Sequence, residues 1–237
     1  MSTAIARSAC ALALALLAAC GDGGKAGTEL FPLEEGLAWR YAVATTTRQG
    51  TSRDIHEVVS LGGRAVDGSR HYVRRTAGGT DYHFTVDDEG VWRVGKRLVV
   101  ELAPQPDVPR RLVLPREPRV GAQWQNTTHP YVLRRLVHDG VDMRRAYVVP
   151  MNYTIEAVDE TVSVPAGEFT GCVRVVGQAE LQMYVDGPTG MRSIPLVTEE
   201  WYAPGVGLVR LRRTETIEST LMASGTLEMS LLAIRRN

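Results

Sequence analysis

Apolar and polar residues alternate along most of this chain, and this period of two is the feature that most constrains its fold. Successive side chains of a β-strand point to opposite faces, so alternation predicts strands with one buried face. In residues 173–185 every second position is apolar or small. Further runs lie at residues 39–43, 82–86, 153–157, 208–216 and 226–234. Helical spacing is not evident over any long segment beyond the leader, so the sequence predicts an all-β protein.

Glycine and proline separate these runs. Turns are expected at residues 62–63, 78–79, 139–140, 165–167, 187–190 and 204–205. Short alternating strands with frequent turn residues predict an antiparallel sheet, a sandwich or a barrel. A short strand is expected at residues 97–102, whereas residues 103–119, which contain five prolines, are expected to be irregular.

One short pattern recurs and suggests an internal repeat. Gly36-Leu-Ala-Trp39 and Gly121-Ala-Gln-Trp124 each follow a proline and each lead into a strand, and the two glycines are 85 residues apart. We therefore expect two meander repeats, placed edge to edge within one curved sheet and one domain.

The N-terminus carries a leader. Arg7 is followed by an apolar run, Ala9–Ala19, which suits a signal peptide and is too short to span a bilayer. Leu17-Ala-Ala-Cys20 then resembles the lipobox of bacterial lipoproteins. The resemblance implies that residues 1–19 are removed and that Cys20 is acylated and anchors the chain in a membrane. The alternative is an ordinary secretory signal that is cut after Ala19.

A glycine-rich tether follows the anchor. Residues 21–28 contain four glycines, and a flexible chain of this length reaches roughly 15 Å. The β domain is expected to span residues 29–237. In the lipoprotein sorting rule an Asp directly after the acylated Cys retains the protein in the inner membrane. In this chain the residue directly after Cys20 is Gly21, so we expect the protein to be anchored in the outer membrane.

Charge gives no indication of a polyanionic partner. The chain has 27 Lys and Arg against 27 Asp and Glu, so no net field recruits nucleic acid. Arginine pairs occur at 74–75, 134–135, 144–145 and 212–213. Because neighbours on a strand face opposite ways, one Arg of each pair would face a core, a cleft or a partner. The simpler interpretation is an open sheet whose two faces are both partly wet.

The sequence predicts no catalytic residue, cofactor or metal site. Cys172 is the only thiol left after processing and acylation, and it is expected to be buried and inert. The pairs Asp54/His56 and Asp81/His83 could share a metal, but surface histidines are the simpler interpretation. Acidic residues 87–89 lack the spacing of a calcium loop. No nucleophile elbow, zinc-protease or phosphate-loop motif occurs.

Three segments resemble a known group. They are Phe-Pro-Leu-Glu-Glu-Gly-Leu-Ala-Trp-Arg-Tyr (31–41), Val-Pro-Ala-Gly-Glu-Phe-Thr-Gly-Cys-Val (164–173) and Trp-Tyr-Ala-Pro-Gly-Val-Gly-Leu-Val-Arg (201–210). They resemble motifs of uncharacterised bacterial lipoproteins and periplasmic proteins, including the DUF3108-like proteins. The resemblance implies a curved antiparallel sheet or half-barrel, and it brings no catalytic residues.

Three functions are compatible with these features. The first is a noncatalytic envelope protein that docks a protein or polysaccharide. The second is a carrier or sensor that holds an apolar ligand in a concave sheet, and the third is a hydrolase with an unrecognised site. Docking requires a filled core, in which Trp39, Trp124 and Trp201 pack the sheet, and an exposed patch of arginine or aromatic residues. A carrier requires an open apolar cavity lined by one of them.

Overall fold

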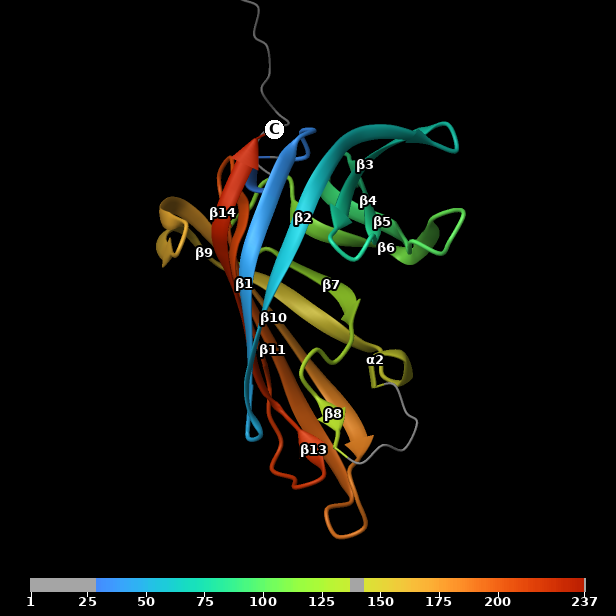
Figure 1. Ribbon diagram of the computed structural model, residues 1–237, viewed down its shortest axis with the longest axis vertical. Coiled ribbons are helices and arrows are strands. Elements are labelled where there is room, and N and C mark those ends of the chain that lie inside the picture. Colours follow the sequence, from blue (N-terminus) through green and yellow to red (C-terminus); the bar gives the residue numbers. More distant parts are fainter. Residues whose placement is uncertain (1–28, 137–142, 237) are drawn as a thin grey trace, which may run out of the picture.

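The chain is almost entirely β-structure (Figure 1). The computed structural model describes residues 29–136 and 143–236. The first strands are β1 (Leu37–Thr47), β2 (Gly50–Val66), β3 (Ser69–Thr76), β4 (Asp81–Val86), β5 (Gly90–Arg97) and β6 (Gln105–Pro115). Then come β7 (Gln123–Thr128), β8 (Arg134–Arg135), helix α2 (Met143–Ala146), β9 (Val149–Val164) and β10 (Gly167–Tyr184). The last are β11 (Met191–Ala203), β12 (Gly207–Glu215), β13 (Met222–Ala223) and β14 (Gly225–Arg236).

One 12-stranded antiparallel sheet contains all the long strands, in the order β6-β5-β4-β3-β2-β1-β14-β12-β11-β10-β9-β7. The first meander runs from β1 outward to β6, and the second runs from β7 inward to β14. They join where β1 pairs with β14, from Leu37 opposite Arg236 to Thr47 opposite Gly225. The expected fold class, an all-β curved sheet or half-barrel, is therefore confirmed.

The two Gly-x-x-Trp segments occupy corresponding places in these meanders. Gly36 and Gly121 both have φ of 86°, a conformation that favours glycine. The Gly36 amide donates to the Ser60 carbonyl of β2, and the Gly121 amide donates to the Ile155 carbonyl of β9. Each segment thus starts its meander by bonding to the second strand of the same meander, as an internal repeat requires.

The sheet curves until its two outer strands, β6 and β7, approach each other without forming a ladder. Side chains bridge this seam. Asn126 Nδ2 donates to the Leu112 carbonyl over 2.8 Å, and Arg111 Nη2 donates to Thr127 Oγ1 over 3.1 Å. The seam is the reason that the fold is a nearly closed half-barrel rather than a complete barrel.

The proline-rich segment is a strand, so the prediction of an irregular crossing at residues 103–119 is wrong for most of its length. β6 is an edge strand whose ladder partner is β5 alone. An edge strand needs backbone donors on one side only, so prolines are tolerated there. Pro106, Pro109 and Pro115 all lie within it.

Two other boundaries also differ from the sequence prediction. Residues 98–102 form the connection after β5 rather than a strand, and the Glu101 amide donates to the Leu98 carbonyl over 3.0 Å. Residues 62–63 do not end a strand, because β2 continues through them as a bulge. Gly62, with φ of 69°, supplies the backbone conformation that this bulge requires.

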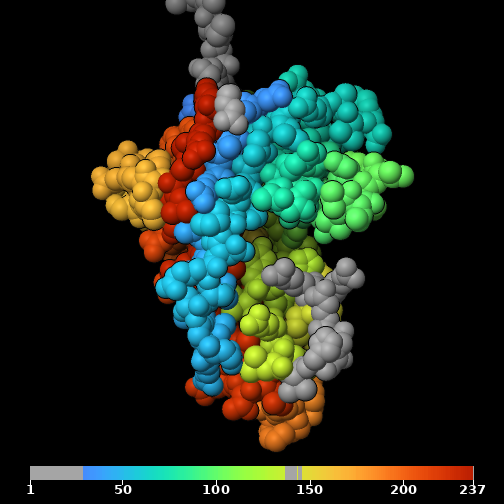
Figure 2. Space-filling view, in the orientation of Figure 1, coloured from blue at the N-terminus to red at the C-terminus, as the bar shows by residue number. Residues whose placement is uncertain are grey.

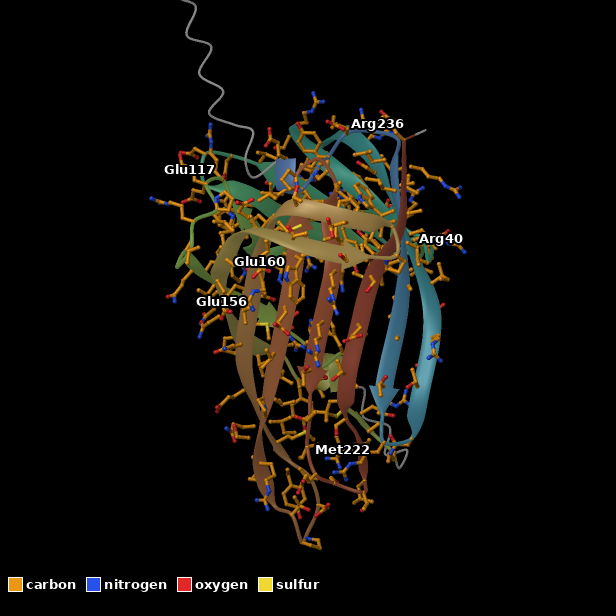
Figure 3. All side chains as sticks on the ribbon, turned by 90° about the vertical axis from the view of Figure 1, so that its left-hand side faces the viewer. Arg40, Glu117, Glu156, Glu160, Met222 and Arg236 are labelled. Atoms are coloured by element: carbon orange, nitrogen blue, oxygen red, sulfur yellow. The ribbon has the colours of Figure 1, made fainter. Side chains whose placement is uncertain are left out.

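The far part of the β9–β10 hairpin folds back across the sheet (Figure 3). The Ala166 amide donates to the Leu231 carbonyl of β14 over 3.0 Å. Val162 and Cys172 pack in one cluster with Val209 and Leu231. This hairpin therefore covers strands from the middle of the sheet and gives Cys172 its apolar surroundings.

Large apolar side chains fill the interior. Those that are at most 2% exposed include Trp39, Leu114, Met151, Ile155, Leu181, Met183, Ile194, Leu196, Met222 and Leu231. On β10 and β11 they alternate with outward residues such as Gln182 and Pro195, so they occupy the inner face. Among the described residues no helix is long and apolar enough to cross a membrane.

Candidate docking face

Two of the arginine pairs divide between the core and the surface, so the simpler expectation of an open sheet with both faces wet is wrong for them. Arg213 is 1% exposed, whereas Arg212 lies outside, 3.6 Å from Glu228. Arg74 is also buried, whereas its neighbour Arg75 is exposed and pairs with the buried carboxylate of Asp81. The other two pairs differ. Residues 134–135 form the short strand β8, and residues 144–145 lie in α2 rather than in a strand.

The buried Arg213 serves the architecture. Its Nε lies 2.8 Å from Glu215 Oε1, and both side chains are at most 1% exposed. The Glu215 carboxylate also accepts hydrogen bonds of 2.8–3.0 Å from three consecutive backbone amides, Tyr131, Val132 and Leu133. This ion pair fixes the segment that leads into β8 against the sheet.

Arg74 has an aromatic environment. Its guanidinium carbon lies 3.5 Å from the Phe31 ring centroid and 4.4 Å from that of Trp39. Its Nη2 donates to the Pro32 carbonyl over 2.7 Å. Burial lowers the pKa of Arg74 to about 10, and the neighbouring Tyr41 opposes that change. Arg74 remains a cation at neutral pH and ties the segment before β1 to the core.

A carboxyl group also lies within the sheet interior. Tyr202 Oη donates to Glu200 Oε2 over 2.5 Å. Burial raises the pKa of Glu200, and the hydrogen bond from Tyr202 and the charge of Arg213 offset only part of this rise. The interior therefore combines packed apolar side chains with hydrogen-bonded polar groups, whereas Arg74 Nε and both ring nitrogens of His83 are buried without a partner among the described residues.

A polar groove lies on the outer face, where β7, β9 and β10 are neighbours. Its volume is about 490 Å³. The lining residues are Gln123, Trp124, Gln125, Asn152, Thr154, Glu156, Val176 and Gln178. The register explains how they meet, because Gln125 is paired with Asn152 and Asn152 lies opposite Gln178. Gln125 Nε2 donates to Asn152 Oδ1 over 2.9 Å, so the two amides hold each other in place.

Trp124 joins this groove to the seam. Its ring stacks on Tyr153, with centroids 5.6 Å apart and planes 9° from parallel. Its Nε1 is buried and has no hydrogen-bond partner among the described residues. The groove thus contains side-chain amides, which both donate and accept hydrogen bonds, beside Trp124, whose own donor is buried.

A cluster of charges continues this face. Arg174 lies 3.3 Å from Glu156, 3.2 Å from Glu160 and 3.6 Å from Glu199. Glu156 and Glu160 both come from β9 (Figure 3). Three carboxylates share one guanidinium, so the surface next to the groove has local negative charge. We call the groove and this cluster the docking face.

The three tryptophans have different environments. Trp39 is 2% exposed, and its Nε1 donates to the Val206 carbonyl over 2.7 Å. Trp201 is half-buried, and its Nε1 donates to Glu160 over 2.8 Å. Trp201 and Tyr202 lie on opposite faces as predicted, with Tyr202 in the core. Trp39 and Trp124 contact core clusters, and Trp201 borders the docking face as well.

Cys172 is fully buried, in agreement with the prediction. Its Sγ donates to the Phe169 carbonyl over 3.4 Å. Burial and the nearby charge of Glu160 raise the pKa of the thiol, so the reactive thiolate is disfavoured. Cys20, the predicted acylation site, and the turn at residues 139–140 lie outside the described residues.

The two aspartate–histidine pairs do not meet, because β3 separates β2 from β4. His83 instead lies 5.6 Å from His71, measured between ring centroids. The carboxylate of Asp81 binds Arg75 and Arg97 over 2.6 Å. In the described part of the chain, no group of three or more potential ligands could hold a metal ion.

The sequence did not single out the amides of the docking face. Gln123, Gln125, Asn152 and Gln178 occupy outward positions of strands, where any polar residue is expected. A signal does exist, because two short segments, 123–126 and 152–154, are rich in amides and hydroxyls. Only the register brings these segments beside residue 178 on a third strand.

Comparison with known proteins gives one family match. Residues 109–222 match the DUF3108-like family model. No curated protein matches the chain. An exported protein of Bacteroides fragilis with a YmcC-like fold is 15% identical, with a TM-score of 0.39 over 86% of this chain and 97% of that chain. A lipoprotein of Parabacteroides distasonis is 13% identical, with a TM-score of 0.36 over 87% of this chain and 98% of that chain. The family match supports a relationship to the uncharacterised DUF3108-like group.

Proposed function

We propose that this protein is a lipid-anchored, noncatalytic member of the DUF3108-like group that docks a polysaccharide of the bacterial envelope. Acyl chains on Cys20 hold it in the outer membrane, and the docking face binds the polysaccharide. Leu17-Ala-Ala-Cys20 supports the anchor, and Gly21 supports the outer membrane. The family match over residues 109–222 supports the group.

The amide-lined groove carries the proposed activity. Gln123, Gln125, Asn152 and Gln178 each offer a donor and an acceptor, and sugar hydroxyls also offer both. A groove of about 490 Å³ on an open sheet face suits an extended polymer. The net charge of zero gives no long-range attraction for a polyanion, so hydrogen bonding is the expected basis of recognition.

The filled interior disfavours the carrier alternative. Met151, Leu181 and Leu196 are at most 1% exposed and pack in one cluster. The buried Arg213–Glu215 pair adds charge to the same interior. An apolar ligand would have to displace these side chains, and expelling packed groups to admit it costs more than filling an open cavity.

Binding to purified peptidoglycan sacculi and to oligomers of N-acetylglucosamine tests the docking proposal. Cosedimentation measures the first, and calorimetry measures the second. Gln125→Ala and Gln178→Ala are each expected to weaken binding about tenfold, the effect of losing roughly 1.4 kcal/mol of hydrogen bonding. Gln182→Ala is the matched control, because Gln182 is an exposed residue of the same strand outside the groove. Equal binding by all three variants would contradict the proposal.

Cell fractionation tests the anchor separately. Cys20→Ala is expected to abolish acylation and to move the protein out of the membrane fraction or leave it unprocessed. Mass spectrometry of the native protein should show two kinds of acyl modification on an N-terminal Cys20. An unmodified Cys20 in native membranes would exclude lipidation.

A further inference from the structure

The connection between β5 and β6 carries apolar side chains that point into solvent. Val99 is 71% exposed, Val100 is 84% exposed and Leu102 is 103% exposed. On β6, Val108 is 87% exposed. We call residues 98–102 the apolar tip. In Figure 2 the green tip region projects from the upper right of the molecule, away from the rest of the sheet.

The fold does not need these side chains for its core. The tip is shaped by its own polar groups, because the Leu98 amide donates to Glu101 Oε2 over 2.8 Å. Arg97 Nη1 also donates to the Glu101 carbonyl over 3.4 Å. Val99 does face the β3–β4 turn, since a Cβ placed on Gly79 would lie 3.2 Å from the Val99 Cβ. The tip is therefore a defined turn that presents aliphatic groups outward.

The hairpin that bears the tip contains more basic than acidic residues of its own. Residues 90–115 contain five basic residues, Arg93, Lys96, Arg97, Arg110 and Arg111, and two acidic residues, Glu101 and Asp107, which leaves a net charge of +3. Arg93, Arg97 and Arg110 are paired with carboxylates, Arg110 with Asp87 and Glu89 just outside the hairpin. Lys96 is exposed and has no ion pair with a described residue. A free cation thus lies beside exposed aliphatic side chains.

We infer that the apolar tip inserts into a lipid bilayer, as a second membrane contact beside the anchor of the proposed function. Branched aliphatic side chains next to Lys96 match the acyl boundary and the anionic headgroups of a bilayer. A protein partner fits less well, because protein hot spots are enriched in Trp, Tyr and Arg. The tip itself, residues 98–102, contains none of these.

The consequence is a fixed orientation. The proposed lipid anchor alone does not set how the domain is turned relative to the membrane. A second contact at the apolar tip holds β5 and β6 at the bilayer. Because the groove lies on β7, β9 and β10, across the seam from β6, this contact determines how the docking face is presented.

An environment-sensitive label tests the inference. The processed, acylated protein is reconstituted into phosphatidylcholine vesicles, with and without phosphatidylglycerol, after Val100→Cys labelling with a nitrobenzoxadiazole dye. Asp67→Cys is the control, because Asp67 lies in the exposed turn between β2 and β3, away from the apolar tip. We expect a blue shift and quenching by spin-labelled lipids at position 100 only, with a stronger effect in anionic vesicles.

Three outcomes can be distinguished. If position 100 behaves like position 67 in both kinds of vesicle, the inference is wrong. If its emission shifts only when envelope protein is added, the tip is a protein contact and the inference is also wrong. A shift that Leu102→Asp reduces at least fivefold would support insertion. If Cys20 proves unmodified or sacculi do not bind, the proposed function fails, yet the label still reports whether added vesicles contact the tip.

Discussion

Glu215 illustrates how a single buried side chain can organise a loop. Its carboxylate accepts from three consecutive amides and from Arg213, so both of its oxygens are satisfied without water. Removing one member of such a pair leaves the other charge buried and uncompensated, which is more costly than the pair itself.

Glu215→Ala is therefore expected to lower the free energy of unfolding by about 3–5 kcal/mol. Urea denaturation followed by fluorescence measures the change. Glu228→Gln is the control, because it breaks a half-exposed pair with Arg212 and should cost about 0–1 kcal/mol. Equal stability of the two variants would show that the buried network contributes nothing.

Cys172 provides a second test at this scale. Because the side chain is fully buried, a thiol reagent such as dithionitrobenzoate should react with the acylated protein only after denaturant is added. Cys172→Ser should lower the free energy of unfolding by about 1–3 kcal/mol if the new hydroxyl finds no hydrogen-bond partner. Binding to sacculi should not change. Rapid labelling of the native protein would mean that the β9–β10 hairpin does not seal this site.

At the scale of the elements, the sheet depends on its tryptophans to different extents. Trp39 lies in the central strand β1 and is 2% exposed, whereas Trp201 is half-buried beside the docking face. Trp39→Ala is expected to lower the free energy of unfolding by about 3–5 kcal/mol, and Trp201→Ala should lower it by clearly less. Thermal melts of both variants make the comparison. A nearly unchanged melting temperature for Trp39→Ala, together with loss of lipid binding, would instead favour a carrier.

The elements also show where sequence patterns are informative. Alternation and turn residues predict most of the long strands, because burial of one face imposes a period of two. They mispredict β6, since a proline-rich segment becomes a strand only when it lies at a sheet edge. The arginine pairs leave open whether one member faces inward, and they do not predict that Arg213 would meet Glu215. The sequence does not predict the groove, because the groove depends on which outward residues the strand register places side by side.

For the whole molecule, stability should depend on pH through Glu200. Burial raises its pKa in the folded protein, so the folded form holds a proton that the unfolded form has already lost. Stability therefore falls as pH rises from the usual pKa of a glutamate towards the raised one. Glu200→Gln keeps the hydrogen bond with Tyr202 possible and removes this dependence.

The measurement is the free energy of unfolding of the wild type and of Glu200→Gln at several values between about pH 4 and pH 8. As pH increases, the free energy of unfolding of Glu200→Gln should rise relative to that of the wild type. Using the difference between the two proteins cancels groups such as Asp81, whose pKa is lowered mainly by its hydrogen bond with Arg75. A difference that is constant with pH would show that Glu200 titrates normally.

The pairing of β1 with β14 has a consequence for how the chain folds. Neighbouring long strands otherwise follow one another along the chain, so each meander can form from local contacts. The β1–β14 ladder joins segments from opposite ends of the domain, and such distant contacts form slowly. During synthesis from the N-terminus, β1 has an unpaired edge until its last partner has been made. An exposed edge of this kind invites association with other chains, so the growing polypeptide needs protection until its end arrives.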